Sequence, residues 1–218
     1  MTQLTSGNAV IYELAAANEN MTDIDRLSNL YWALLSVLRG GVPGAVVELG
    51  CNAGLTSVFF GMVIATEDPA RELHLFDSFE GLPKPSAFDA YLKEGDCRTS
   101  IDAVHESFAH WGVPLPDIHP GWFEDTLPSQ LPSQVAFAYL DGDFYNSILV
   151  SLQHVWPQLA TGGSILIDDY CDSERNPRAW DGLPGVKKAC DDYFGPLGVT
   201  GRVLVGSGDL AFIEYRKS

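Results

Sequence analysis

Short apolar runs alternate with segments of helical spacing along most of this chain, and this alternation restricts its fold more than any other feature. The runs typical of buried strands are residues 44–50, 72–79, 116–122, 135–141 and 163–169. Strands that alternate with helices predict a mostly parallel sheet that is covered on both faces. Residues 202–216 have the pattern of two further strands joined by the turn "GSGD", which predicts a closing antiparallel hairpin. The sequence therefore predicts one doubly wound α/β sheet of seven strands.

The segments between these strands carry the patterns of helices. Apolar residues recur at helical spacing over residues 23–39, and Gly40, Gly41 and Pro43 end that helix. Further helices are expected at 55–67, 99–112, 146–159 and 185–195. The first helix is apolar over a wide arc, so we expect it either to cover the sheet or to meet its copy in a symmetric dimer.

No linker divides the chain. We therefore expect a helical cap at residues 1–40 and a single domain at 41–218. The stretch from Lys84 to Gly95 is rich in turn formers and has no periodicity, which predicts a mobile loop.

The net charge of −16 over 218 residues narrows the classes of partner. Nucleic-acid binders and proteins of anionic membrane surfaces need a basic face, so neither partner is expected. The four cysteines show no CxxC spacing, no run approaches the length of a membrane span, and the first residues lack a signal-peptide pattern. These features predict a cytoplasmic protein with reduced thiols.

Acidic residues lie in or directly after the predicted strands. They are Glu48, Asp77, the pair Asp141 and Asp143, and the pair Asp168 and Asp169. One acid at a strand end is common, because aspartate favours turns and helix caps. In a parallel sheet, however, all of these positions lie on the rim where ligands bind. Their accumulation on one rim therefore predicts a site.

The first strand is followed by the loop "ELGCNAG", which opens a helix in the way a nucleotide-binding loop does. Gly50 and Gly54 bracket the loop, and Asn52 is the best non-glycine residue for a positive φ. Asp77 would accept hydrogen bonds from both hydroxyls of a ribose. Glu48 would act either through the cofactor's ammonium group or through amides of the loop.

We also place Ser78, Trp122 and Asp141 in this cofactor site. The Trp122 ring follows the third strand, where it would cover an adenine, although a core position for this tryptophan is nearly as well supported.

Six motifs occur in the order and spacing of a known family. They are "VPGAVVELGCNAG", "HLFDSFEGLP", "GWFEDTLP", "YLDGDFYNS", "GGSILIDDY" and "GVKKACDDYF". From about Val42 to Phe194 the chain thus resembles the macrocin O-methyltransferases. The resemblance implies a Rossmann-like class I methyltransferase fold, S-adenosylmethionine as methyl donor and a Mg²⁺ ion. It also implies a sugar hydroxyl of a natural product as acceptor, and often a homodimer.

The same resemblance implies that Asp141, Asp168 and Asp169 hold the metal and that Asp143 is the base. The chemistry of the residues agrees, because Mg²⁺ prefers about six oxygen ligands and three carboxylates leave places for a vicinal diol. Acids gathered without a cation would repel one another, and no cluster of Lys or Arg lies near them in sequence.

Other functions stay open at this point. The same metal chemistry would methylate a catechol or another phenol, and a non-catalytic adenosyl-binding module is a further class. A short-chain dehydrogenase is disfavoured, since the chain lacks a Y-x-x-x-K motif in the right place. Among the histidines, His154 is the best reserve base, because it lies on the helix after the D-G-D turn.

Overall fold

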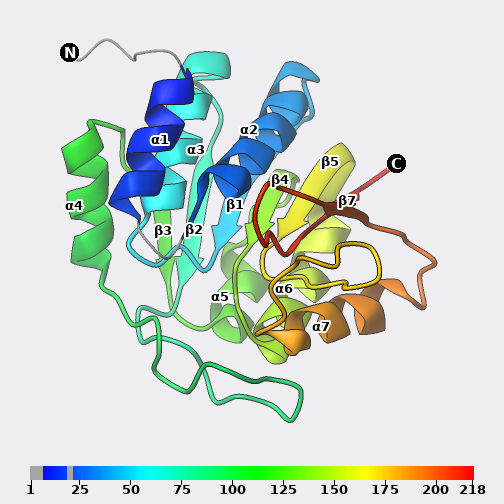
Figure 1. Ribbon diagram of the computed structural model, residues 1–218. Helices are drawn as coiled ribbons and strands as arrows, with labels where there is room; N and C mark the ends of the chain where they lie inside the picture. The colour runs from blue at the N-terminus through cyan, green and yellow to red at the C-terminus, as the bar shows by residue number, and fades with distance from the viewer. Residues whose placement is uncertain (1–6, 19–21) are drawn as a thin grey trace.

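A seven-stranded sheet forms the centre of the computed structural model, which describes residues 7–18 and 22–218 (Figure 1). The strand order is β3-β2-β1-β4-β5-β7-β6. The strands are β1 Ala45–Leu49, β2 Leu73–Asp77, β3 Asp117–Pro120, β4 Val135–Leu140, β5 Leu159–Ile167, β6 Arg202–Leu204 and β7 Phe212–Arg216. All neighbours are parallel except β7, which is antiparallel to both β5 and β6. The predicted sheet and its closing antiparallel hairpin are confirmed.

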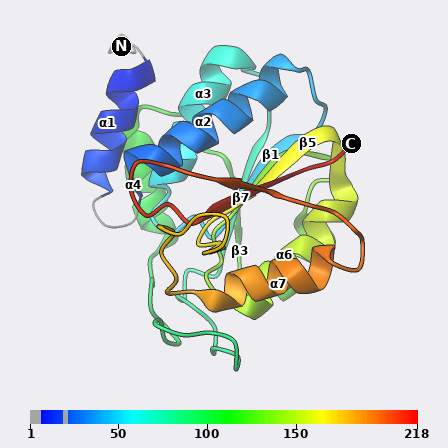
Figure 2. The same ribbon diagram turned by 45° about the vertical axis from the view of Figure 1, so that its right-hand side comes forward.

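Helices cover both faces of this sheet, as Figures 1 and 2 show. One layer contains α1 Gly7–Ala17, α2 Ile24–Arg39, α3 Leu55–Glu67 and α4 Ile101–Trp111. The opposite layer contains α5 Phe123–Gln130, α6 Tyr145–Gln158 and α7 Pro184–Phe194. Each layer has its own hydrophobic cluster. Val46 belongs to the first cluster and Val47 to the second, so β1 is buried on both faces and reads as a continuous apolar run.

Two helices were not predicted. Helix α5 is short, carries Pro128 within it and is acidic in its first turn, so its sequence lacks a clear helical period. Helix α1 lies in the region that we assigned as a helical cap, but no separate helix was predicted there.

Helix α2 covers the sheet. Leu27, Leu30 and Leu34 are fully buried in the same cluster as Val46 and Phe60. Asp23 caps the helix, because its carboxylate accepts the Arg26 amide at 2.7 Å. The first of the two roles expected for this helix is therefore observed, while the domain boundary at residue 40 stays a prediction. Within the described residues, no helix combines the length and apolar character that a membrane span requires.

The strand register brings the ends of the central strands to one edge. Leu49 pairs with both Phe76 and Leu140, and Leu140 pairs with Ile167. The residues that follow these positions therefore emerge side by side. Strand β1 lies between β2 and β4, so the strand order reverses direction at β1. Ligands of α/β sheets bind at such a switch point.

Candidate active site

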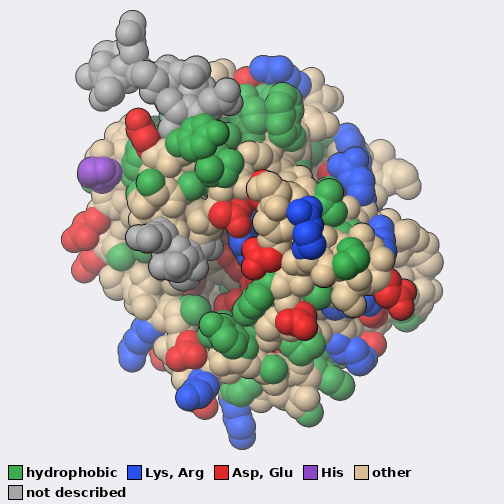
Figure 3. Space-filling view, in the orientation of Figure 1, with side chains coloured by type: hydrophobic (Ala, Val, Ile, Leu, Met, Phe, Trp, Pro, Cys, Tyr) green, Lys and Arg blue, Asp and Glu red, His purple; other side chains and the backbone are tan. Residues whose placement is uncertain are grey.

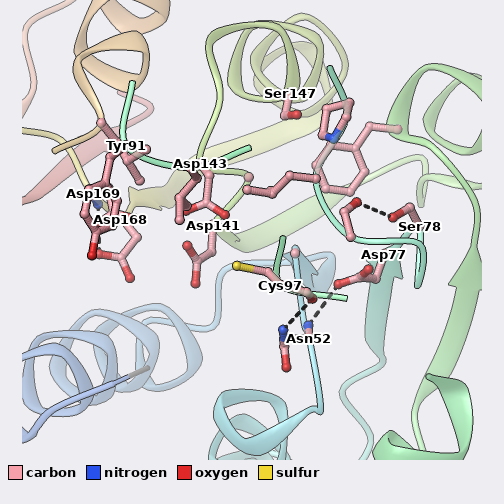
Figure 4. Close-up of a pocket in the computed structure, with 18 of the residues that line it drawn as sticks. Asn52, Asp77, Ser78, Tyr91, Cys97, Asp141, Asp143, Ser147, Asp168 and Asp169 are labelled. Carbon is pink, nitrogen blue, oxygen red and sulfur yellow. Dashed lines mark hydrogen bonds between the residues drawn. The ribbon is translucent and has the colours of Figure 1, made fainter. Parts of the chain in front are cut away.

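A cavity of about 710 Å³ opens at this edge, between the segments that follow β1, β2, β4 and β5. The predicted site residues that line it are Gly50, Asn52, Asp77, Ser78, Trp122, Asp141, Asp143, Asp168 and Asp169. Figure 4 shows Asp77 and Ser78 at one side of the cavity and the other four aspartates toward the opposite side. The cavity thus has two halves of different chemistry.

The loop after β1 shapes the first half. Gly50 has a φ of 93°, and a Cβ atom there would collide with the backbone oxygen of Asp141. Only glycine fits this close approach of two strand ends. Asn52 has a φ of 46°, which confirms the positive φ expected for it. Gly54, with a φ of 79°, caps α3 and lies behind the cavity lining.

Asp77 fastens this loop to the end of β2. Its carboxylate accepts the amide of Asn52 at 2.9 Å and the amide of Phe79 at 2.8 Å. Burial raises the pKa of Asp77, and these backbone hydrogen bonds act in the opposite direction. Each carboxylate oxygen keeps a further lone pair, so the side chain can accept hydroxyl groups from a ligand in the cavity.

Glu48 lies beneath the loop and is only 1% exposed. The Ser57 hydroxyl donates a hydrogen bond to it. Burial raises the pKa of Glu48 to about 8, against the opposing effect of Ser57. Glu48 is absent from the residues that line the cavity, so a direct contact with the cofactor's ammonium group stays a prediction.

The second half of the cavity is a cluster of carboxylates. One oxygen from each of Asp141, Asp143 and Asp169 lies within 4.8 Å of the others. Asp143 and Asp169 have φ values of 57° and 56°. Such a conformation is strained for a residue with a side chain, and strain of this kind is typical of functional sites.

Burial and mutual repulsion dominate the electrostatics of these acids. Burial first, and then the Asp168 charge, raise the pKa of Asp141 and Asp169 well above the usual range. The same two causes raise the pKa of Asp143 to about 7. A hard divalent cation among these oxygens would remove the repulsion, and carboxylates are the ligands such a cation prefers. The donor set therefore fits Mg²⁺, although Asp143 completes this cluster where Asp168 was the predicted third ligand.

Asp168 is held differently from the other acids. The Arg26 Nε atom donates to its two carboxylate oxygens at 2.9 and 3.0 Å, and the Tyr139 hydroxyl donates at 2.5 Å. Arg26 also contacts Asp169 at 3.4 Å. The Asp168 charge is the main reason why the pKa of Arg26 is raised.

Sequence reasoning missed Arg26. No cation near the acids in sequence could neutralise them, whereas this arginine lies 142 residues before Asp168 and reaches it from α2. Other lining residues were also missed, among them Tyr91, Cys97, Ser147 and Trp180. No local sequence pattern indicated that these residues line a site. Three of them lie in segments without periodicity, and Ser147 is an ordinary helix residue.

The remaining candidates are less central. Trp122 lines the cavity at the start of α5, and its contact with an adenine stays a prediction. His154 lies on α6 and is absent from the cavity lining.

The sequence of this chain is similar to those of known O-methyltransferases. Residues 12–191 match the sequence model of the family described as Macrocin-O-methyltransferase (TylF). The chain is 33% identical over 192 residues to 8-demethyl-8-(2,3-dimethoxy-alpha-L-rhamnosyl)-tetracenomycin-C 4'-O-methyltransferase of Streptomyces olivaceus. The aligned region covers 83% of this chain and 69% of that enzyme. It is 31% identical over 197 residues to mycinamicin III 3''-O-methyltransferase of Micromonospora griseorubida, with 84% and 73% covered.

A solved structure resembles the fold closely. The O-methyltransferase NovP superimposes with a TM-score of 0.81 at 22% identity, over 97% of this chain and 98% of that one. The match to the family extends over most of the chain and includes the loop after β1 and the aspartates that follow β2, β4 and β5. This chain belongs to the macrocin O-methyltransferase family.

Proposed function

We propose that this O-methyltransferase transfers the methyl group of S-adenosylmethionine to a hydroxyl of a sugar diol on a glycosylated natural product, with the help of Mg²⁺. The observation that carries the proposal is the convergence of Asp141, Asp143 and Asp169 in the same cavity as the Asp77 loop. The two curated relatives are named for sugar positions of natural products, which supports the acceptor class.

The half of the cavity at β1 and β2 is proposed to bind the cofactor. Asp77 would accept the ribose hydroxyls, and Gly50 and Asn52 let the backbone come close to the adenosyl group. Ser78 and Trp122 are proposed to complete this half, and Asp141 would contact the cofactor from the border with the other acids. Glu48 and Gly54 support the loop from behind.

The other half is proposed to hold the metal and the acceptor. Asp141, Asp168 and Asp169 would hold the ion. In this structure the Asp168 oxygens accept hydrogen bonds from Arg26, Tyr139 and the Asp169 amide, and a bound ion would replace one of these contacts. When bound, Mg²⁺ would orient an acceptor hydroxyl and lower its pKa. Asp143 lies close enough to Asp141 and Asp169 to stand beside such a hydroxyl.

Methyl transfer needs a base for the hydroxyl proton and an in-line arrangement of the oxygen, the methyl carbon and the sulfur. The Asp143 carboxylate takes the hydroxyl proton. Without the metal, burial and the Asp168 charge raise its pKa to about 7, and a Mg²⁺ ion beside it would favour the ionised form that a base needs. The oxygen then attacks the methyl carbon in line with the sulfur, so that a C–O bond forms while the C–S bond breaks. The cavity walls contribute by holding the reactants in this alignment.

Calorimetric titration with S-adenosylmethionine, with and without Mg²⁺, tests the cofactor proposal. We expect binding in both cases, and methyl transfer to a rhamnosylated aromatic polyketide only with the metal. A catechol panel in parallel distinguishes a phenol acceptor from a sugar acceptor. Tighter binding of NAD than of S-adenosylmethionine would contradict the proposal, as would full activity after exhaustive treatment with EDTA.

A further inference from the structure

The cavity has a wall of aromatic rings that the transfer step does not use. Tyr91 comes from the long segment between β2 and α4, and Trp180 comes from the segment between β5 and α7. Their ring centroids are 5.3 Å apart, in an edge-to-face arrangement. Figure 4 shows Tyr91 on the same side of the cavity as Asp168 and Asp169, away from Asp77 and Ser78. The pair therefore borders the acceptor half.

Tyr91 is presented in an unusual way. Its side chain is 74% exposed although it lines the cavity, and its φ is 70°. A large aromatic residue in a left-handed conformation is rare, and an exposed one gains little from packing. Strain together with exposure at a cavity mouth indicates a residue kept for contact with a ligand.

Both rings are carried by anchored segments. The Asp89 carboxylate, two residues before Tyr91, accepts the Tyr145 amide of α6 at 2.7 Å. The Trp180 amide donates to the Asp209 carbonyl at 2.8 Å. Gly182 packs against the Trp180 ring so closely that a Cβ atom at this position would collide with the ring. These contacts fix the wall before an acceptor arrives.

The charges of the cavity exclude one form of sugar. Among the described lining residues, Arg26 is the only lysine or arginine, and it is already paired with Asp23, Asp168 and Asp169. The other charged residues are acids and extend to Glu124 and Asp209. A nucleoside diphosphate sugar would bring its anionic diphosphate into this field without an arginine fork to receive it, and the proposed function commits the Mg²⁺ ion to the acceptor hydroxyls instead.

We infer that Tyr91 and Trp180 determine acceptor specificity by contacting the apolar aglycone of a glycoside, and that a nucleoside diphosphate sugar is not the substrate. This inference rests on the proposed function. Aromatic faces pack well against flat apolar bodies and against the C–H faces of sugars. The reaction that supplies the substrate is then a glycosyl transfer to the aglycone, and methylation follows it.

Three acceptors with the same sugar test the inference. They are a rhamnosylated aromatic polyketide, methyl α-L-rhamnoside and a nucleoside diphosphate rhamnose. Trp180→Ala and Tyr91→Ala should each raise KM for the polyketide glycoside about tenfold and leave KM for the methyl glycoside unchanged. Trp180→Phe and Tyr91→Phe should retain most of the wild-type preference. Gly182→Ala should resemble Trp180→Ala, because it displaces the ring without removing it.

Binding measurements separate this inference from the proposed function. Calorimetry should give every variant the wild-type affinity for S-adenosylmethionine, and Leu197→Ala, an exposed residue away from the cavity lining, should change nothing. The polyketide glycoside should also quench the fluorescence of Trp180. That contribution is obtained by subtracting the emission of Trp180→Phe from that of the wild type. Better turnover of the nucleoside diphosphate sugar, equal effects on both glycosides, or no quenching would overturn the inference. Failure of wild type to bind S-adenosylmethionine or to methylate any acceptor would instead overturn the proposed function, and the inference with it.

Discussion

At the scale of single residues, the site depends on the balance between four carboxylates and one guanidinium. Arg26 neutralises Asp168, while Asp141, Asp143 and Asp169 face one another with raised pKa values. The presence of these acids on one rim could be predicted, because parallel strands end at a common edge. The pairing with Arg26 could not, because it depends on how α2 packs on the sheet.

Asn substitutions should separate metal ligand from base. Asp143→Asn keeps the shape, so Mg²⁺ and S-adenosylmethionine should still bind in calorimetry, while turnover falls by about 10²–10⁴. Asp168→Asn should lower the affinity for Mg²⁺ itself. Loss of Mg²⁺ affinity in Asp143→Asn, with unchanged affinity in Asp168→Asn, would make Asp143 the ligand and leave Asp168 as the partner of Arg26 alone.

Glu48 should make stability fall as pH rises. Burial raises the pKa of Glu48 from 4.5 in its ordinary state to about 8, so the folded protein holds a proton that the unfolded chain releases. This contribution is fully present below about pH 4.5 and is lost as pH approaches 8. Its size is on the order of 1.4 kcal/mol for each unit of the pKa difference.

Urea unfolding between pH 5 and 9 measures this effect against a Glu48→Gln variant. The variant should show a shallower fall of the unfolding free energy with pH than the wild type. The raised pKa values of Asp141, Asp143 and Asp169 would also make stability fall as pH rises. Both series should therefore contain saturating Mg²⁺, which would keep these three carboxylates ionised. Parallel curves for the two proteins would show that Glu48 is ionised in the folded state.

At the scale of elements, the strands and long helices could be predicted and the connecting segments could not. Buried runs such as residues 135–140 contain almost only apolar residues, because both faces of the sheet are covered. Asn52 could be placed at a positive φ from its residue type. The left-handed φ values of Asp143 and Asp169 were not predicted, although aspartate also tolerates this region, because these residues were considered only for their charge. The stretch Lys84–Gly95 has contacts that link it to α6 and α7, and its mobility stays a prediction.

Asp89 should stabilise helix α6 from this distant segment. The residue at the N-cap of α6, Phe144, offers no side-chain hydrogen bond, and Asp89 accepts the Tyr145 amide instead. Gly185 leaves space for that carboxylate. Asp89→Ala should therefore lower the unfolding free energy by about 1 kcal/mol, the usual loss for a helix cap.

A matched control for this change is Ser86→Ala, which removes only a 3.2 Å hydrogen bond from the exposed Phe88 amide. Urea unfolding should show little change for it. Equal effects of the two substitutions would mean that Asp89 does not act as the cap of α6.

At the scale of the whole molecule, an apolar face remains outside the core. Trp32 on α2 is 67% exposed and Tyr12 on α1 is 61% exposed, and Figure 3 shows hydrophobic side chains gathered over these helices. Acidic side chains surround the hollow near the centre of the same view. Large exposed aromatic residues are typical of protein interfaces, so the outer side of α2 is a candidate for the second role expected of that helix.

We propose that this face joins two copies of the chain in a symmetric dimer. In a twofold interface each substitution appears twice, so a charge at Trp32 would be buried without a partner at two places in the same contact. Light scattering at micromolar concentration should give a dimer for the wild type and a monomer for Trp32→Glu. Leu115→Glu should remain dimeric, because Leu115 is 56% exposed but lies outside α1 and α2. Thermal melting separates dissociation from unfolding, since Trp32→Glu should keep a cooperative transition that no longer shifts with protein concentration. A monomeric wild type, or a Trp32→Glu variant that remains dimeric, would place the interface elsewhere or remove it.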